Sequence, residues 1–302
     1  MQPEISLKAT GRSRRRMLVN KLFEGSSILA AALAIAVLAV VIWSVGSRGV
    51  SAINLDFFLK GPSSSFFGGG GGIAPAFVGS FLLVAIAVAF ALPVGVLSAI
   101  YVSEFAPAAI GRQVRLWLDV LNGFPSIVIG IFVFALAVKV KVPLLGIGHH
   151  QSAVAGGFAL SVIMLPLIAR STMEVLRLVP NHLREASYAL GVSKWQTVLR
   201  VVLPTSFGGI LTGTTLAVAR AAGETAPLLF TCALAGQVVD WNPTHSVMSL
   251  PLTIFEYSES ADPSQHAQAW AAAFVLIVFV LVTSLVSRLL LDRSRRKLGL
   301  AR

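Results

Sequence analysis

Two charged residues, Arg220 and Glu224, stand four positions apart in a long stretch that is otherwise apolar, and Thr225 follows them directly. A charged side chain at the centre of a membrane-spanning helix costs about 2.5–3.5 kcal/mol, so the pair needs a role that offsets this cost. A guanidinium can replace the hydration water of an oxyanion with two parallel charge-assisted hydrogen bonds. Glu224 would keep Arg220 from trapping the anion, and Thr225 would add a neutral hydroxyl donor. These three residues are therefore candidates for the lining of an anion path.

A purely structural explanation of the same residues stays open. Side chains four positions apart lie on one face of a helix, so Arg220 and Glu224 would form an ion pair there without touching a substrate. Charged side chains near the end of a membrane-spanning helix also reach the headgroup region. Both explanations place the pair in a helix that crosses a membrane.

The composition of the chain is typical of a membrane protein. Its 302 residues include 24 Lys and Arg against 13 Asp and Glu, a net charge of +11, yet only 12% are charged and 56% are hydrophobic. A soluble domain carries about 25% charged residues. The basic residues gather at the two ends beside apolar runs, which argues against a nucleic-acid surface. A single cysteine, Cys232, and five scattered histidines predict neither a disulfide nor a metal site.

Six regions are long and apolar enough to cross about 30 Å of hydrocarbon at about 1.5 Å per residue. They cover residues 26–45, 76–102, 117–140, 152–176, 205–233 and 269–291. The middle four are interrupted by Pro93, by residues 122–126, by Pro166, and by Arg220 with Glu224. Such interruptions require neighbouring helices or a wet cavity to satisfy the freed backbone groups. The sequence therefore predicts an all-α integral membrane protein with six transmembrane helices.

The distribution of Lys and Arg predicts the orientation, because loops rich in these residues stay in the cytoplasm. With the N-terminus inside, the inner segments hold 18 of them and the outer segments four, while Arg170 and Arg220 lie within spans. This predicts a basic cytoplasmic segment over residues 1–25, a transmembrane domain over 26–291 and a basic cytoplasmic tail over 292–302. The apolar run from 28 to 45 is longer than the core of a signal peptide, so we expect no cleavage.

The inner loop over residues 177–204 predicts two short helices joined by an elbow. Asn181 is placed to cap the first helix, and Gly191 to end it in the left-handed conformation. Ser193 and Gln196 have the spacing of a capping box for the second helix, which Pro204 would separate from the next span. Apolar residues recur at helical spacing on a face of each helix. They are Leu183, Ala186 and Leu190 in the first, with Ser187 on the same face, and Trp195, Val198, Leu199 and Val202 in the second.

The polar side of this loop carries Arg184, Glu185 and Lys194, which we expect to project into the cytoplasm. Two interpretations are open. The amphipathic pair of helices could only anchor the bundle at the membrane surface, or it could be the contact for a cytoplasmic partner.

The spacing of particular residues in the loop resembles the EAA loop of bacterial ABC importer permeases. Glu185-Ala186-Ser187, then Gly191, then Val201-Val202-Leu203-Pro204 follow that pattern over 20 residues, with Ser187 in place of an alanine and Val201 in place of an isoleucine. The resemblance implies the type I permease fold, in which the elbow is a coupling helix that docks on a cytoplasmic ATPase subunit. It assigns Glu185, Ala186, Ser187 and Gly191 to that coupling site.

The segment from Arg220 to Pro227 is similar to the RAxGETAP motif of the phosphate-specific ABC importer permeases, which form the two related families PstA and PstC. Three further features favour the PstA family. They are Gly71-Gly72-Ile73 with Pro75, Gly123-Phe124-Pro125-Ser126, and Leu250-Pro251-Leu252 with Ile254.

The resemblance also implies the setting of the chain. It would be a subunit in the bacterial plasma membrane that pairs with a PstC-like permease, rests on a PstB-like ATPase dimer and receives phosphate from an extracytoplasmic PstS-like binding protein. ATP and Mg would be held by the ATPase, so we expect neither a cofactor nor an enzymatic activity in this chain.

Other residues carry weaker predictions. Arg170 and Glu174 are expected to pair at the inner end of their helix, and Gly209 with Gly213 to form a close-packing face whose partner stays open. His149-His150 is expected in a solvated outer turn, and the acidic loop 234–268 is a weak candidate for contact with a binding protein.

Rival functions are an ABC permease for sulfate or molybdate, an ion-coupled secondary transporter, and a membrane scaffold without transport.

Overall fold

The computed structural model describes residues 11–62, 71–140, 151–232 and 238–297, and within these ranges it holds helices and no strand. The elements, in chain order, are α1 (Arg12–Gly49), η1 (Val50–Ala52), α2 (Leu55–Leu59), α3 (Ala74–Ile100), η2 (Tyr101–Phe105), α4 (Ala108–Gly123), α5 (Ser126–Val140), α6 (Ala153–Arg177), α7 (Asn181–Ala189), α8 (Lys194–Thr197), η4 (Val198–Val202), α9 (Leu203–Ala222), α10 (Leu228–Thr231), α11 (Leu250–Glu259) and α12 (Pro263–Lys297). The elements η2 and η4 are single π-helical turns. The predicted all-α class is confirmed.

Five helical segments of the described chain are long and apolar enough to cross a membrane, and a bent helix pair brings the number to six if it counts as one span. The pair is α4 and α5, which meet at 100°. The single interrupted span predicted over 117–140 is therefore two helices in different directions. Pro125 explains the break, because it lacks an N–H and forces Phe124 into an extended conformation (ψ 136°). Pro93 and Pro166, in contrast, stay inside α3 and α6.

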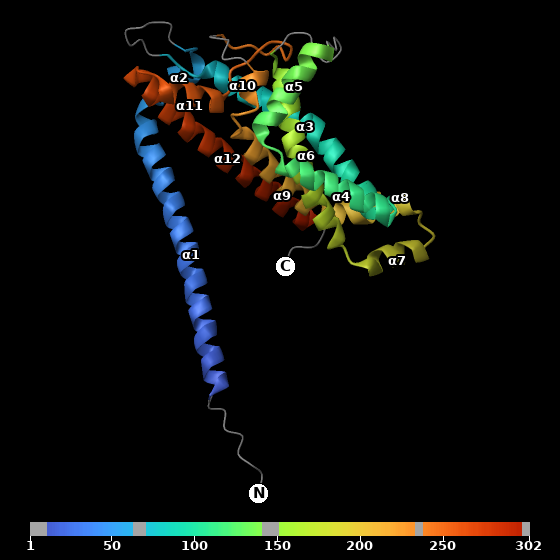
Figure 1. The fold of residues 1–302 in the computed structure, drawn as a ribbon. Helices are drawn as coiled ribbons and strands as arrows, with labels where there is room; N and C mark the ends of the chain where they lie inside the picture. The colour runs from blue at the N-terminus through green and yellow to red at the C-terminus, as the bar shows by residue number, and fades with distance from the viewer. Residues whose placement is uncertain (1–10, 63–70, 141–150, 233–237, 298–302) are drawn as a thin grey trace.

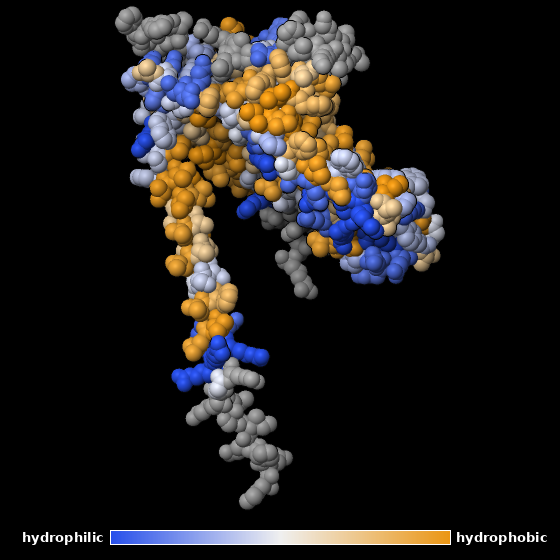
Figure 2. Space-filling model, viewed as in Figure 1, coloured by the Kyte–Doolittle hydropathy of each residue, from blue (hydrophilic) through white to orange (hydrophobic). Residues whose placement is uncertain are grey.

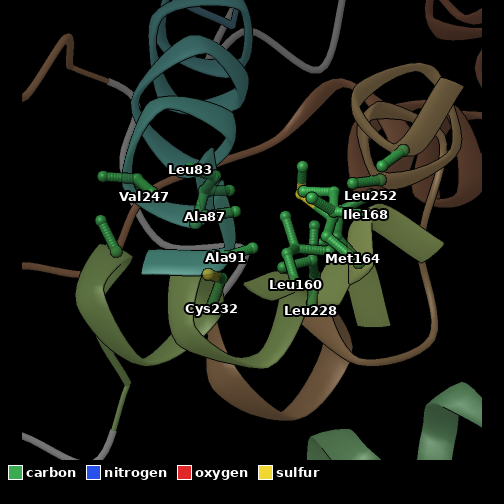
Figure 3. Packing of buried hydrophobic residues seen from close by; sticks show 13 residues of the cluster. Leu83, Ala87, Ala91, Leu160, Met164, Ile168, Leu228, Cys232, Val247 and Leu252 are labelled. Carbon is green, nitrogen blue, oxygen red and sulfur yellow. The ribbon is translucent and has the colours of Figure 1, made fainter. Parts of the chain in front are cut away.

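The core of the bundle lies where α3, α6 and α9 pack together (Figures 1 and 3). Figure 3 shows side chains of α3 and α6 directed toward one another, and the short helix α10 closes the same cluster. The buried residues include Leu83, Ala87 and Ala91 of α3, Leu160, Met164 and Ile168 of α6, Ala217 and Ala221 of α9, and Leu228 and Cys232. Small residues on facing helices allow close approach, which provides van der Waals packing where lipid removes the hydrophobic driving force.

The small-residue face of α9 packs against α6 of the same chain, which answers the question that the sequence left open. A Cβ atom added to Gly209 would lie 2.5 Å from Val175 Cγ1, and one added to Gly213 would lie 2.5 Å from Ser171 Cβ. The two helix backbones approach each other closely only because neither position carries a side chain.

Replacing Gly213 by leucine is expected to lower the stability of the α6–α9 contact by about 1–3 kcal/mol or more, because the new side chain overlaps Ser171. The measurement is the midpoint of thermal unfolding of the detergent-solubilised protein. Gly25→Leu is the matched control, since a Cβ at Gly25 meets nothing within 4 Å. Equal midpoints for the two variants would contradict the packing described.

Helix α1 diverges from the bundle along most of its length and joins it only near its C-terminal end (Figure 1). There Gly49 lies against the backbone of Trp270, and the Arg48 guanidinium sits 4.8 Å from the Trp270 ring centroid. Nearly all of the apolar part of α1 is exposed. Figure 2 shows this apolar length ending in hydrophilic residues at the N-terminal side. Arg14, Arg15 and Arg16 are exposed there, so α1 presents the pattern of a span flanked by a basic anchor.

Candidate functional site

The elbow between α7 and α8 is built around Gly191, whose φ of +77° confirms the predicted left-handed residue. The Val192 N–H donates to the Ser187 carbonyl at 3.2 Å and the Gly191 N–H to the Tyr188 carbonyl at 2.9 Å. These two bonds are the Schellman pair that ends a helix at a glycine. A Cβ added to Gly191 would meet nothing within 4 Å. The requirement for glycine therefore comes from the backbone conformation and not from crowding.

One side-chain contact joins the two arms of the elbow, and a second orders the start of α8. The hydroxyls of Ser187 and Thr197 share a buried hydrogen bond of 2.9 Å between α7 and α8. At the start of α8, the Ser193 N–H and hydroxyl both donate to Gln196 Oε1, at 3.3 and 2.8 Å. The predicted pairing of Ser193 with Gln196 is confirmed. Ser187, which replaces an alanine of the EAA pattern, thus gains a structural role inside the elbow.

Two local predictions for this loop are wrong. Pro180 and not Asn181 is the N-cap of α7, and Asn181 is its first residue, without a capping bond. Pro204 does not separate two helices. It lies in the first turn of α9, which continues from α8 through the π-helical turn η4 as one 29-residue segment. A regular helix would need an N–H group at Pro204, which proline lacks. The wider π turn just before Pro204 changes the hydrogen-bond partners of the backbone at this point.

The predicted apolar faces pack only in part. Ser187, Val198 and Val202 are buried, whereas Leu190 is 83% exposed. Trp195 and Leu199 are also more than half exposed, and Glu185 and Ala186 of the EAA pattern are exposed with them. Figure 2 shows that the surface around α7 and α8 is otherwise mainly hydrophilic. Exposed aromatic and aliphatic side chains within a polar surface are typical of a protein contact.

The side chain of Arg184 does not project into solvent as predicted. Its Nη2 donates to Glu104 Oε1 at 2.7 Å and to the Leu176 carbonyl at 3.0 Å, and its Nη1 donates to the Val179 carbonyl at 2.6 Å. The side chains of Arg184 and Glu104 are only 15% and 6% exposed. The sequence offered no signal for this pair, because its members are 80 residues apart.

Arg220 and Glu224 do come together, but not along one helix face. Helix α9 ends at Ala222 and Gly223 is its C-cap, so Glu224 lies beyond the helix. Arg220 Nε and Glu224 Oε1 are 3.7 Å apart, with 53% of the Arg220 side chain and 17% of the Glu224 side chain exposed. Within the described ranges the guanidinium donates no closer hydrogen bond. More than half of the Arg220 side chain is exposed, and the carboxylate of Glu224 holds an opposite charge beside it.

The loop after Arg220 is held in place by close backbone contacts. The Leu228 and Leu229 N–H groups donate to the Thr225 carbonyl at 3.1 and 3.3 Å, which starts α10. A Cβ on Gly130 of α5 would lie 2.6 Å from Pro227 Cα, so this glycine allows α5 to rest directly on the loop. Glu224 and Thr225 therefore lie in one short loop supported by α5, directly after Arg220 in the last turn of α9, and the helix predicted within 205–233 ends before this loop.

The sequence predicts that Arg170 pairs with Glu174 of the same helix. In the structure Arg170 pairs instead with Asp119 of α4. Both side chains are about half exposed. The i, i+4 spacing suggested a partner on the same helix, but the neighbouring helix presents a carboxylate on the same face. Asp119 lies within the region 117–140 that the sequence predicts to be a single span.

Two backbone hydrogen bonds join the loop that precedes α11 to the start of α6. The carbonyls of His245 and Pro243 accept the Ala153 and Val154 N–H groups at 2.8 and 3.0 Å, which satisfies the start of α6. The Asn242 N–H and His245, whose Nδ1 lies 2.6 Å from Oδ2, hold the pKa of Asp240 below its ordinary value. Among the described residues no three His, Cys, Asp or Glu side chains gather around a metal-sized site. His149-His150 lies outside the described residues.

Comparison with known proteins fits this geometry. The family model of binding-protein-dependent transport system inner membrane components matches residues 91–297. The fold resembles one chain of a bacterial alginate ABC transporter (TM-score 0.62, 12% identity, 95% of this chain and 98% of that chain) and one of the MetNI methionine ABC transporter (0.56, 20%, 74% and 94%). The class is thus the multi-pass membrane permease of an ABC importer, which works with an ATPase and a binding protein.

Sequence relatives narrow the class to a family. The chain is 36% identical to the phosphate transport system permease protein PstA of Haemophilus influenzae, over 91% of this chain and 95% of that protein. It is 38% identical to PstA of Xylella fastidiosa (93% and 96%) and 38% identical to PstA 1 of Mycobacterium tuberculosis (84% and 82%). The chain belongs to the PstA family of phosphate transport system permease proteins.

Proposed function

We propose that this chain is the membrane-spanning permease of an ATP-driven importer of inorganic phosphate and forms half of the translocation path. One observation carries the substrate class. Arg220 presents an exposed guanidinium that is paired only loosely, at 3.7 Å, with Glu224. A phosphate oxyanion suits such a fork of donors, and the nearby carboxylate weakens binding enough for the ion to leave. The names of the relatives agree with this substrate.

The other subunits of the proposed importer follow from the same family. The second half of the path would come from a PstC-like permease, and a PstS-like protein would deliver phosphate from outside. ATP and Mg would be bound by a PstB-like ATPase dimer that docks at Glu185, Ala186 and Gly191, with Ser187 fixing the elbow from within. With that elbow in the cytoplasm, both termini are cytoplasmic as well, in agreement with the excess of Lys and Arg on that side.

Uptake of radiolabelled phosphate at low external phosphate, in cells with and without this gene, tests the substrate. We expect the gene to supply an uptake that arsenate inhibits, that sulfate and molybdate leave unchanged, and that ATP depletion abolishes. Competition by sulfate or molybdate instead of arsenate would favour the other oxyanions. Uptake that follows the proton gradient alone would favour a secondary transporter.

A further inference from the structure

Two consecutive residues of η2, the turn that follows α3, contact the coupling elbow. Glu104 pairs with Arg184 of α7 at 2.7 Å, and the ring of Phe105 lies 5.3 Å from Lys194 Nζ at the start of α8. Both residues belong to the π-helical turn η2, a rare local geometry that often marks functional positions. One turn of backbone therefore contacts both arms of the elbow, on either side of the Gly191 bend.

Arg184 extends the contact to a third helix. Besides Glu104, it donates to the carbonyl of Leu176 in the last turn of α6 and to that of Val179 just after the helix. The ion pair is nearly closed to solvent, and a buried charge that loses its partner is strongly destabilised. The guanidinium thus binds α7 to α3 and α6 with little freedom. A cavity of about 300 Å³ beside the pair, lined by Ser103, Glu104, Leu176, Arg177, Asn181 and Arg184, leaves room for conservative exchanges at either position.

Movement of this turn has a direct route into the bundle. Val102 of η2 and Ala99 of α3 share one buried cluster with Ala169 and Met173 of α6 and Leu118 of α4. The same helix α3 continues into the central cluster around Leu83 and Ala87. A displacement of the elbow would therefore reach α3 and α6 through packed atoms, and not only through the chain connection into α9.

We propose that Glu104 and Phe105 form a clamp through which the elbow moves α3, and that Glu104 and Arg184 are positioning residues for coupling. This inference rests on the proposed role of the elbow as the ATPase contact. If the ion pair has a purely structural role, its loss lowers the amount of assembled complex. If it is part of a clamp, its loss lowers the phosphate transported per ATP hydrolysed. The two can be separated in the assembled complex.

The experiment uses vesicles that contain the full complex of this chain, the second permease and the ATPase, with the phosphate-binding protein and ATP supplied. Phosphate transported per ATP hydrolysed is compared for wild type, Glu104→Gln, Phe105→Leu and Asp56→Asn. Asp56 is the matched control because it pairs with Lys60 at the same distance of 2.7 Å, but with both side chains more than half exposed. The amount of assembled complex is measured for each variant by size-exclusion chromatography.

We expect Glu104→Gln to assemble and to hydrolyse ATP while its transport per ATP falls on the order of tenfold. Phe105→Leu should give a smaller loss and Asp56→Asn none.

Wild-type transport per ATP in assembled Glu104→Gln complexes would overturn the clamp. If Glu104→Gln does not assemble, Phe105→Leu decides, because Phe105 is 43% exposed and leucine keeps an apolar side chain there. An unchanged ratio in that variant overturns the clamp as well. Wild-type complexes that fail to transport phosphate would refute the proposed function, and the clamp with it.

Discussion

Replacement of Arg220 by lysine is expected to lower the initial rate of phosphate uptake by about 10- to 100-fold. Lysine keeps the charge but loses the planar fork that donates two parallel hydrogen bonds to one oxyanion. The structure places this fork at the exposed end of α9 with only a 3.7 Å contact to Glu224, so the exchange removes little from the fold itself. The measurement is uptake of radiolabelled phosphate, normalised to the amount of assembled complex.

Arg48→Lys is the matched control for this exchange. Arg48 contacts the Trp270 ring at the end of α1, and lysine supports the same cation–π contact. We expect its uptake to equal that of the wild type. Full uptake by Arg220→Lys would show that a bidentate clamp on the anion is not needed and would favour a structural role for the ion pair.

Replacement of Gly191 by valine is expected to uncouple ATP hydrolysis from transport without preventing membrane insertion. A left-handed residue other than glycine costs about 1–2 kcal/mol, and a β-branched side chain raises this cost further. Such an energy shifts the population of the bent elbow by about 5–30-fold, so we expect a fall in transport of that order. Phosphate uptake and ATPase activity of the same assembled complex are the two measurements.

Gly191→Asn separates backbone strain from side-chain bulk. Asparagine tolerates the left-handed conformation, and the space around Gly191 is open, so this variant should retain most of the transport. Equal losses in both variants would point to a contact surface that tolerates no side chain. Normal transport by Gly191→Val in an assembled complex would show that the bent conformation of the elbow is not needed for coupling.

The sequence predicted those parts of the fold and site that depend on near neighbours. Gly191 could be identified because a turn signal followed an amphipathic run, and the Ser193–Gln196 contact because a capping box spans three residues. The helical class followed from long apolar runs. Each of these features is encoded within a few positions of the chain.

Contacts between distant segments could not be predicted. Glu104 is paired with Arg184 and Asp119 with Arg170, and in each case the sequence suggested solvent or a partner on the same helix. Glu224 was expected on a helix that in fact ends at Ala222, because an apolar run does not reveal where Gly223 ends it. Which carboxylate meets which arginine depends on helix crossings that a single sequence does not specify.

The most direct test of the central claim is phosphate accumulation in vesicles reconstituted with this chain, its permease partner and its ATPase. The loaded binding protein is supplied on the outer side and ATP on the side of the elbow. We predict accumulation against a phosphate gradient that requires ATP and the binding protein and that is unaffected by dissipating the proton gradient. Accumulation without ATP, or an ATPase that runs in the complete complex while no phosphate enters, would contradict the assignment of this chain as the phosphate-conducting permease.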